Sequence, residues 1–347
     1  MRSMLRTHGA RVDTADVGSA SLCSASQSQG ARATYGHSQG GRVASNHLVG
    51  AMRLAARSPT LAGMHRGTPR APGSSRAVSA RDGDGSLAVT WAGHATALIE
   101  LDGVRILTDP VLRNRVGPLR RTAPPVSEQL AAGIDAVILS HLHSDHADIP
   151  SLRGVGENVA VLAPRGAGRW LARHGVRNVH ELSRGEQAHV GSVRVAATGA
   201  RHDPHRRPLG VKADPIGFMV TGSQGLYFAG DTDLFAEMSE LSGSVDLALL
   251  PIAGWGPTLG PGHLDPQRAL QAAAQIAPRL VIPIHWGTLA IGWPAWWARG
   301  QQRPVREFSA LMVRDLPSVE LRVLAPGERT VLRPPEGTSD RPKTDAQ

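Results

Sequence analysis

The chain has 347 residues, of which 41% are hydrophobic and 19% are charged, and its formal net charge at pH 7 is +9. This length allows one large domain or two small ones, and no apolar run reaches the roughly 18 residues of a membrane-spanning helix, so we expect a soluble, cytoplasmic protein. The single cysteine, Cys23, excludes an internal disulfide framework and a zinc site built from cysteines.

The positive charge is concentrated near the beginning of the chain. Residues 1–85 contain eleven arginines and four aspartates, a net charge of +7, so the other residues carry only +2 of the total. Their serine-, glycine- and alanine-rich sequence lacks the apolar periodicity of a core, which predicts a disordered low-complexity tail. An unusual targeting segment and upstream sequence translated from a misassigned start are the alternatives. A basic tail also binds polyanions loosely, so a nucleic-acid-binding protein is the non-enzymatic alternative for the chain.

Predicted strands begin at Leu87, and Asp102-Gly103 is a hairpin turn between two of them. Residues 110–125 form an arginine- and proline-rich loop, which we expect at the edge of a site. Short helices are predicted at 127–132 and 169–174. The strands predicted in this part of the chain are 87–91, 97–101, 104–108, 136–139 and 159–162.

The second half of the chain repeats this alternation, with helices predicted at 234–241 and 267–276. Two runs of strands with helices alongside indicate two sheets packed face to face and covered by helices. The sequence pattern alone predicts a domain of mixed α/β fold over residues 86–333. It also predicts a frayed C-terminal tail over residues 334–347. The strands predicted in this half are 193–198, 217–221, 225–229, 247–251, 280–284, 319–324 and 330–332.

The densest cluster of potential metal-binding side chains is His141-Leu-His-Ser-Asp-His146, which comes directly after the predicted strand 136–139. Its three imidazoles and one carboxylate, from His141, His143, Asp145 and His146, are groups that bind a divalent ion of the zinc type. The two-residue spacing of the first two histidines suits an extended or turning backbone and not a helical zinc-protease motif. A rigid strand that ends in this polar turn predicts a metal site.

Three further candidate ligands, His202, Asp231 and His285, also follow predicted strands. Separate strands can deliver such polar groups to one edge of a rigid scaffold. His205 lies three residues after His202 and could replace it as a ligand.

The H-x-H-x-D-H stretch resembles the signature of the metallo-β-lactamase fold superfamily. The resemblance covers roughly residues 86–290 and is specific for fold and metal site, and less so for substrate. Other stretches resemble ordered motifs of the branch with N-acyl-phosphatidylethanolamine phospholipase D-like proteins, ascorbate-6-phosphate lactonase-like proteins and bacterial relatives. They are Trp91-Ala-Gly-His-Ala-Thr96, Leu107-Thr-Asp-Pro110, Ala200-Arg-His202, Ala229-Gly-Asp-Thr232, Gly262-His-Leu-Asp-Pro266 and Ile284-His-Trp-Gly287.

This resemblance implies a four-layer αββα sandwich with two divalent metal ions at one edge, with Zn²⁺ as the expected ion and Mn²⁺ or Fe²⁺ as alternatives. It also implies a hydroxide held by the two ions that attacks a phosphodiester, with a lactone or another carboxylic ester as the alternative. We expect a small-molecule or lipid-like substrate, no specific nucleic acid and a possible homo-oligomer. The implied ligands are His141, His143 and His202 for one ion, Asp145, His146 and His285 for the second, and Asp231 as the bridge.

Several nearby residues have predicted supporting roles. Asp145 would also orient the hydroxide, and His263 resembles an additional histidine of the branch, which implies a substrate-orienting or general-acid role. The alternative for His263 is a residue at the entry of a helix whose N-cap is Asp265. His94 and Asp109 fit positions that orient ligating imidazoles, although local turn hydrogen bonds explain them equally well.

Four of the seven tryptophans lie near the predicted ligands in sequence. They would suit a rim for an apolar or acyl substrate, with a core cluster or a subunit interface as alternatives. These residues are Trp255, Trp293, Trp296 and Trp297.

Overall fold

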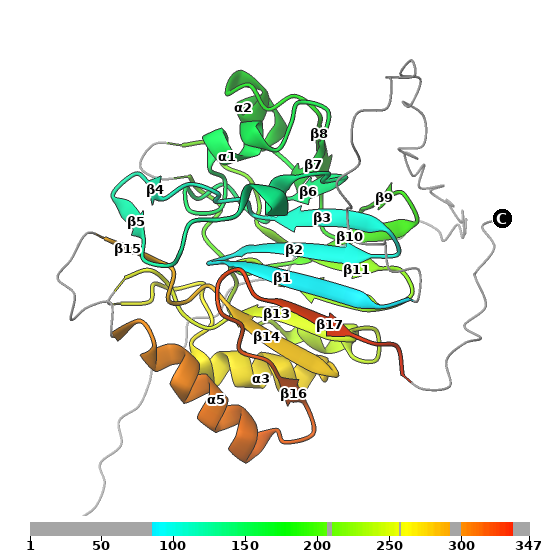
Figure 1. Ribbon diagram of the computed structural model, residues 1–347, viewed down its shortest axis with the longest axis vertical. Coiled ribbons are helices and arrows are strands. Elements are labelled where there is room, and N and C mark those ends of the chain that lie inside the picture. Colours follow the sequence, from blue (N-terminus) through cyan, green and yellow to red (C-terminus); the bar gives the residue numbers. More distant parts are fainter. Residues whose placement is uncertain (1–84, 207–209, 257, 292–299, 336–347) are drawn as a thin grey trace, which may run out of the picture. The chain divides into compact units, whose positions relative to one another are not determined.

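The computed structural model describes residues 85–206, 210–256, 258–291 and 300–335. Two seven-stranded sheets form the centre of this part of the chain (Figure 1). In spatial order, the first sheet contains β17 (Arg329–Leu332), β1 (Leu87–Gly93), β2 (Thr96–Leu101), β3 (Val104–Thr108), β6 (Ala136–Ile138), β7 (Ala160–Pro164) and β8 (Val179–Leu182). The second contains β16 (Glu320–Leu321), β14 (Leu280–Ile284), β13 (Leu247–Pro251), β12 (Gly225–Phe228), β11 (Ile216–Thr221), β10 (Val193–Gly199) and β9 (Gln187–Val190).

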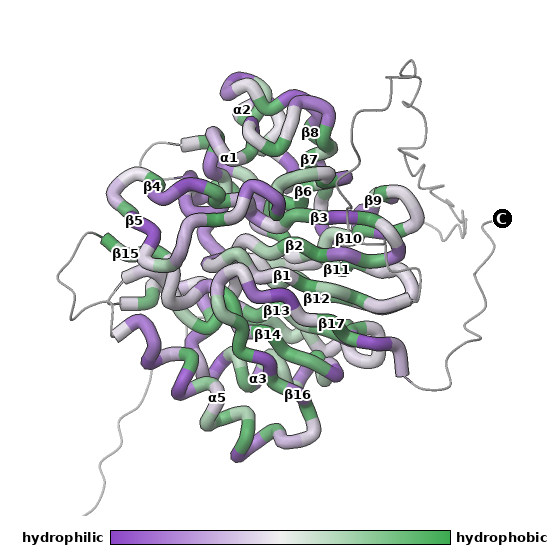
Figure 2. The backbone as a smooth tube through the Cα atoms, viewed as in Figure 1, coloured by the Kyte–Doolittle hydropathy of each residue, from purple (hydrophilic) through white to green (hydrophobic). Residues whose placement is uncertain are grey.

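The two sheets pack face to face through alternating apolar residues. On β1, Leu87, Val89 and Trp91 join the same buried cluster as Phe218 and Val220 on β11. The strands β12, β13 and β14 pair in parallel, and β13 and β14 are buried over their whole length. Burial on both faces explains their continuous apolar sequences, which appear as hydrophobic colours in Figure 2.

Helices cover the outer face of each sheet. Leu152 of α1 (Ile149–Gly154) and Leu171 of α2 (Gly168–Arg173) share a cluster with the outward residues Leu107, Val137 and Val161 of the first sheet. On the second sheet, α3 (Pro266–Ile276) and α5 (Arg303–Asp315) contribute Ala272, Ile276, Phe308 and Met312 to the main core. The predicted four-layer αββα sandwich is therefore confirmed.

The predicted loop 110–125 is partly wrong, because it contains two short strands. β4 (Arg115–Val116) and β5 (Leu119–Arg121) form a hairpin, and β15 (Leu289–Ile291) completes a separate three-stranded sheet. The apolar residues of this sheet form their own small core: Val111, Val116, Leu119 and Leu289, with Ile291 packed against them.

Most predicted elements lie where the sequence pattern placed them, within one or two residues at their ends. The two helices predicted before β6 and β13 are 3₁₀ turns, η1 (Glu128–Ala131) and η2 (Ala236–Leu241). The elements that the pattern missed are α1, α5, β8, β9 and the small sheet. In the described part of the chain, no helix is long and apolar enough to cross a membrane.

Candidate metal centre

The histidine-rich stretch forms a tight turn between β6 and α1. The amides of His146 and Ala147 both donate to the carbonyl of His143, at 3.1 and 2.8 Å. The turn leads directly to Asp148, which caps α1 by accepting a hydrogen bond from the amide of Ser151. A strand before the turn and a capped helix after it hold the intervening side chains in fixed positions.

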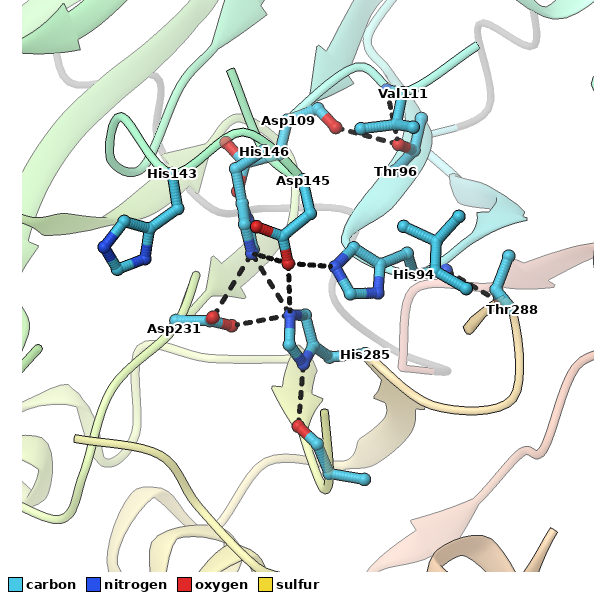
Figure 3. A network of polar contacts seen from close by, with 12 residues as sticks. His94, Thr96, Asp109, Val111, His143, Asp145, His146, Asp231, His285 and Thr288 are labelled. Carbon is cyan, nitrogen blue, oxygen red and sulfur yellow. Dashed lines mark hydrogen bonds and ion pairs between the residues drawn. The ribbon is translucent and has the colours of Figure 1, made fainter. Parts of the chain in front are cut away.

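Four strand ends bring the predicted ligands to one place. Five of these ligands are labelled in Figure 3: His143, Asp145, His146, Asp231 and His285. The turn 141–146 follows β6, and the ends of β10, β12 and β14 contribute one further ligand each. Six of the seven predicted ligands fall into two groups, and within each group the candidate ligand atoms lie within 4.8 Å of one another. The seventh, Asp231, lies 3.2 Å from Nε2 of His146 and 3.2 Å from Nε2 of His285. The seven side chains that the structure brings together are His141, His143, Asp145, His146, His202, Asp231 and His285.

His205, the alternative to His202, lies outside this cluster. Its exposed ring bonds Asp203 through Nδ1, at 3.1 Å. Its backbone carbonyl instead accepts a hydrogen bond from Nε2 of His143, at 3.1 Å. Because a carbonyl oxygen only accepts, the proton of neutral His143 is on Nε2, and Nδ1 keeps a lone pair.

Backbone carbonyls fix two more imidazoles in the same way. Nδ1 of His285 donates to the carbonyl of Ala253, and Nδ1 of His202 donates to the carbonyl of Gly262, both at 2.7 Å. Each neutral ring therefore presents the lone pair of Nε2 on its opposite side. In a metal-binding histidine, the ring nitrogen that faces away from the metal is usually hydrogen-bonded, and the other ring nitrogen is free to bind the metal.

The buried carboxylate of Asp109 fixes the last two rings. Its Oδ2 accepts from Nδ1 of His146 at 2.7 Å and from the hydroxyl of Ser140 at 2.5 Å. That hydroxyl in turn accepts from Nδ1 of His141 at 2.9 Å. Asp109 thus orients a candidate ligand directly, as predicted, and a second one through Ser140.

In each of the five imidazoles, the ring nitrogen that is not bonded to an orienting group points toward the centre. Nε2 of His146 and Nε2 of His285 are 3.1 Å apart, and Nε2 of His202 is 2.9 Å from Nδ1 of His143. Nε2 of His141 is buried and has no hydrogen-bond partner. Opposed lone pairs and an unpartnered buried nitrogen are unfavourable in the protein alone, because a buried polar atom needs a partner. A cation satisfies all of them together, so the donor set fits metal ions.

The electrostatics of the cluster also favour bound cations. Burial lowers the pKa of His285 to about 3 and that of His141 well below 6.5, so both rings are neutral, as metal ligands must be. Burial raises the pKa of Asp231, but His285 and His146 outweigh it and hold this pKa well below the usual range. Burial lowers the pKa of His146, but Asp231 and Asp145 raise it well above 6.5. The carboxylates thus attract positive charge to the centre.

His94 orients the carboxylate of Asp145. Its Nε2 lies 3.0 Å from Oδ2 of Asp145, and its ring packs on that of His285 with centroids 3.9 Å apart. Its own amide donates to Oγ1 of Thr288, at 3.0 Å. The sequence position of His94 predicts that it orients an imidazole, but the hydrogen-bond partner of its ring is the carboxylate of Asp145.

The backbone at the centre adopts unusual conformations. His94, Asp109 and His285 have φ values of 54°, 30° and 63°, in the left-handed region that disfavours residues other than glycine. Gly230 has φ of 61°, and a Cβ there would lie 2.5 Å from Cβ of Ser140. Only glycine allows the chain to bring Asp231 this close to the end of β6.

Arg206 is a residue that the sequence pattern did not predict. Its Nη1 donates to the carbonyls of Leu142 and Ala147, which flank the turn that carries His143. Its guanidinium packs over the Trp170 ring, 4.4 Å from the centroid. A single arginine in a loop has no motif, so its proximity to the turn could have been found only from a three-dimensional structure.

His263 lies at the open side of the cluster. Its Nδ1 donates to the carbonyl of Gly260 at 3.0 Å, and its Nε2 lies 3.4 Å from Oδ2 of Asp231. Burial lowers its pKa, but the hydrogen bond to Asp231 outweighs burial and raises it. Asp265 caps α3 by accepting from the amide of Arg268, so the helix entry does not require His263.

Of the four tryptophans near the predicted ligands, only Trp255 belongs to the described residues, and it is 36% exposed. The predicted apolar rim at Trp293, Trp296 and Trp297 lies outside the described residues.

Comparison with known proteins agrees with this fold. Residues 104–286 match the family described as a β-lactamase superfamily domain. An uncharacterized protein of Mycobacterium tuberculosis is 36% identical over 234 residues, which cover 62% of this chain and 62% of that protein. An N-acyl-phosphatidylethanolamine-hydrolyzing phospholipase D of Caenorhabditis elegans is 29% identical over 236 residues, or 60% of this chain and 66% of that protein. These matches span less than two thirds of each relative's length.

Among solved structures, a metallo hydrolase of the archaeon Ignicoccus hospitalis has a TM-score of 0.55 and 24% sequence identity. The superposition covers 72% of this chain and 99% of that one, which shows that the two share a fold.

Proposed function

The chain belongs to the β-lactamase superfamily, and on that basis we propose that it is a metal-dependent hydrolase of phosphodiesters. The observation that carries the proposal is the convergence of five imidazoles and two carboxylates on one centre. The preference for a phosphodiester is supported by similarity to the phospholipase D of Caenorhabditis elegans and to a yeast mitochondrial relative with the same named activity, which is 32% identical over 223 residues. The latter match covers 58% of this chain and 48% of the yeast protein.

We propose that His141, His143 and His202 hold one divalent ion and that Asp145, His146 and His285 hold a second, with Asp231 between them. Bound divalent ions, for which we propose zinc, would supply Lewis-acid stabilisation of negative charge and water of lowered pKa.

The protein's own groups would perform the remaining steps. We propose that Asp145, whose Oδ2 lies 3.0 Å from Nε2 of His94, accepts a hydrogen bond from the attacking water and so orients it. His263 is partly exposed beside Asp231, which raises its pKa and keeps a proton available. We propose that it donates this proton to the oxygen of the leaving group.

A substrate panel with metal analysis tests this function. We expect the purified protein to contain two divalent ions per chain and to hydrolyse N-acyl-phosphatidylethanolamine and a small activated phosphodiester, with loss of activity in EDTA. Hydrolysis of lactones or carboxylic esters alone would overturn the phosphodiester assignment. Activity that survives complete removal of metal would overturn the mechanism.

We also propose that residues 86–333 form the hydrolase domain and that residues 1–85 take no part in catalysis. The carbonyl of Gly85 accepts a hydrogen bond from Nε2 of Gln224 at 2.8 Å, so a truncated chain should begin at Asp84. We expect this chain to keep the melting temperature and turnover of the full chain. A marked fall in either would show that the removed segment supports the domain.

A further inference from the structure

The hairpin of β4 and β5 carries a concentrated positive charge. We call residues 113–121 the arginine hairpin. They include four arginines, and no aspartate or glutamate occurs between Asp109 and Glu128. The purple segments along this hairpin in Figure 2 mark the hydrophilic residues. Arg113 pairs with Asp148 at 2.6 Å, and Arg121 donates to the carbonyls of Ala92 and Pro124. Within the hairpin, Nε of Arg115 donates to the carbonyl of Gly117 at 2.9 Å, which leaves the two terminal nitrogens of its guanidinium for a ligand.

Two of the four arginines share one exposed face. Arg115 and Arg120 are directly opposite each other in the pairing of β4 with β5, which places their side chains on the same side of the hairpin. Both are exposed, and within the described ranges neither forms an ion pair with a carboxylate. Like charges directly opposite on a strand pair destabilise it. Their placement therefore favours a role in binding an anion.

The scaffold beneath this face is fixed. Val116 and Leu119, on the other side of the hairpin, are buried with Val111 and Leu289. β5 pairs with β15 along its length, and the three strands lie together at the left edge of Figure 1. The backbone that carries this arginine pair is therefore already ordered before an anion binds.

The arginine hairpin is also linked to the metal centre. The amide of Thr122, directly after β5, donates to the carbonyl of Thr288 at 2.8 Å. Thr288 accepts from the amide of His94 and follows the candidate ligand His285 by three residues. A surface bound by the hairpin would therefore have a defined position relative to the site.

We propose that the face of Arg115 and Arg120 docks the protein on an anionic phospholipid bilayer through the phosphate groups of the lipids. This inference rests on the proposed function, in which the substrate is a phosphodiester within a lipid. Guanidinium groups bind phosphate oxygens in bidentate geometry. Residues 110–126 contain no aromatic side chain on which nucleic-acid bases could stack, so a bilayer fits this face better than a single strand of RNA.

Vesicle sedimentation with the full metal-loaded chain tests the proposal. Vesicles of phosphatidylcholine alone are compared with vesicles that also contain phosphatidylglycerol, for the wild type and for the double variant Arg115→Gln/Arg120→Gln. We expect binding to the anionic vesicles to fall about 30-fold, which is about 2 kcal/mol for two arginines near an anionic surface.

A matched control removes the same charge elsewhere. Arg169 and Arg173 are exposed on α2, and the variant Arg169→Gln/Arg173→Gln should bind vesicles like the wild type. An equal loss in both double variants, or no loss in either, would overturn the proposal. Unchanged vesicle binding with loss of RNA binding in the hairpin variant would also overturn it, in favour of a nucleic-acid surface.

The proposed function is tested separately within the same proteins. Hydrolysis of a small water-soluble phosphodiester and the melting temperature should be equal in the wild type and both double variants, because the hairpin arginines do not touch the metal centre. If vesicle binding depends on the hairpin arginines but no phosphodiester is hydrolysed, the proposed function is wrong and the docking surface stands. If phosphodiesters are hydrolysed but vesicle binding does not depend on the hairpin arginines, the proposed docking surface is wrong and the proposed function stands.

Discussion

The two groups of candidate ligands differ in what holds them. We call Asp145, His146 and His285 the inner group and His141, His143 and His202 the outer group. The inner side chains are buried, and His94 and Asp109 contribute side chains that orient two of them. In the outer group, His143 and His202 are half-buried, and loop carbonyls of His205 and Gly262 orient them.

This difference indicates a division of labour between the two groups. In the inner group, Asp145 and His146 are fixed by buried side chains and His285 by the carbonyl of Ala253, so the geometry of this group should change little when substrate binds. In the outer group, buried His141 is held by Ser140. His143 and His202 depend on loop backbone, which adapts more easily, and they lie on the more exposed side of the centre. We infer that substrate approaches over the outer group, where His263 also lies, 4.6 Å from His202 between ring centroids.

The largest effect is expected when Asp231, which we propose bridges the two groups, is replaced. Asp231→Ala should lower the occupancy of both metal positions and reduce kcat/KM on the order of 10,000-fold, because metal-ion stabilisation of transition-state charge is worth several kcal/mol. Metal analysis and kinetics on one preparation check this. Full occupancy by two ions in the variant would contradict the bridging position.

His263→Ala should separate chemistry from metal binding. We expect metal content to be unchanged and kcat to fall about 1,000-fold, within the range that a positioned proton donor supplies. A phosphodiester with a highly acidic leaving group, which needs no proton donor, should be affected far less. Loss of metal from this variant would make His263 a ligand and extend the outer group.

Asp109→Asn tests whether His146 of the inner group and, through Ser140, His141 of the outer group depend on a side-chain partner. Oδ1 of Asp109 accepts from the amide of Ser140, and Oδ2 accepts from His146. In one orientation, the NH₂ group of an asparagine would face the amide N–H of Ser140, and in the other it would face the Nδ1–H of His146. Two donors would therefore face each other in either case. Metal affinity should fall about 10- to 100-fold, as for other residues that orient metal ligands. Titration with a competing chelator measures this, and wild-type affinity would show that the ring of His146 is fixed by other contacts.

The smallest expected effect concerns the turn that carries the outer ligand His143. Arg206→Gln removes a charged donor to the carbonyls of Leu142 and Ala147, and the affinity of the more weakly held ion should fall about tenfold. Arg165→Gln, which removes a surface pair with Glu186, is the control and should keep full affinity. Equal affinities in both variants would show that the turn holds its shape without Arg206.

The sequence predicts the side chains that meet at the candidate metal centre far better than the groups that orient them. Apolar strands that end in histidine or aspartate locate all seven ligand candidates, because both signals depend on side-chain type. The carbonyls of Ala253, Gly262 and His205 belong to residues whose side-chain type is irrelevant to the hydrogen bond, so no pattern could identify them.

Among the secondary-structure elements, the failures have a similar cause. The missed strands β8 and β9 have four residues each and are partly exposed, which leaves too few alternating positions for a clear period. The sequence pattern predicts a loop at the arginine hairpin because β4 and β5 have only two and three residues. Its strands are stabilised by pairing with β15, about 170 residues later in the chain, and such a contact is not visible in local sequence.

The left-handed backbone at His94, Asp109 and His285 limits how this domain could be improved by laboratory evolution. A non-glycine residue held in this conformation costs about 1 kcal/mol or more, and glycine at the same position relieves that cost. Selection for heat resistance alone would therefore favour the removal of functional side chains from the centre. A library selected in this way should accumulate sturdier and inactive proteins, unless turnover is screened in the same round.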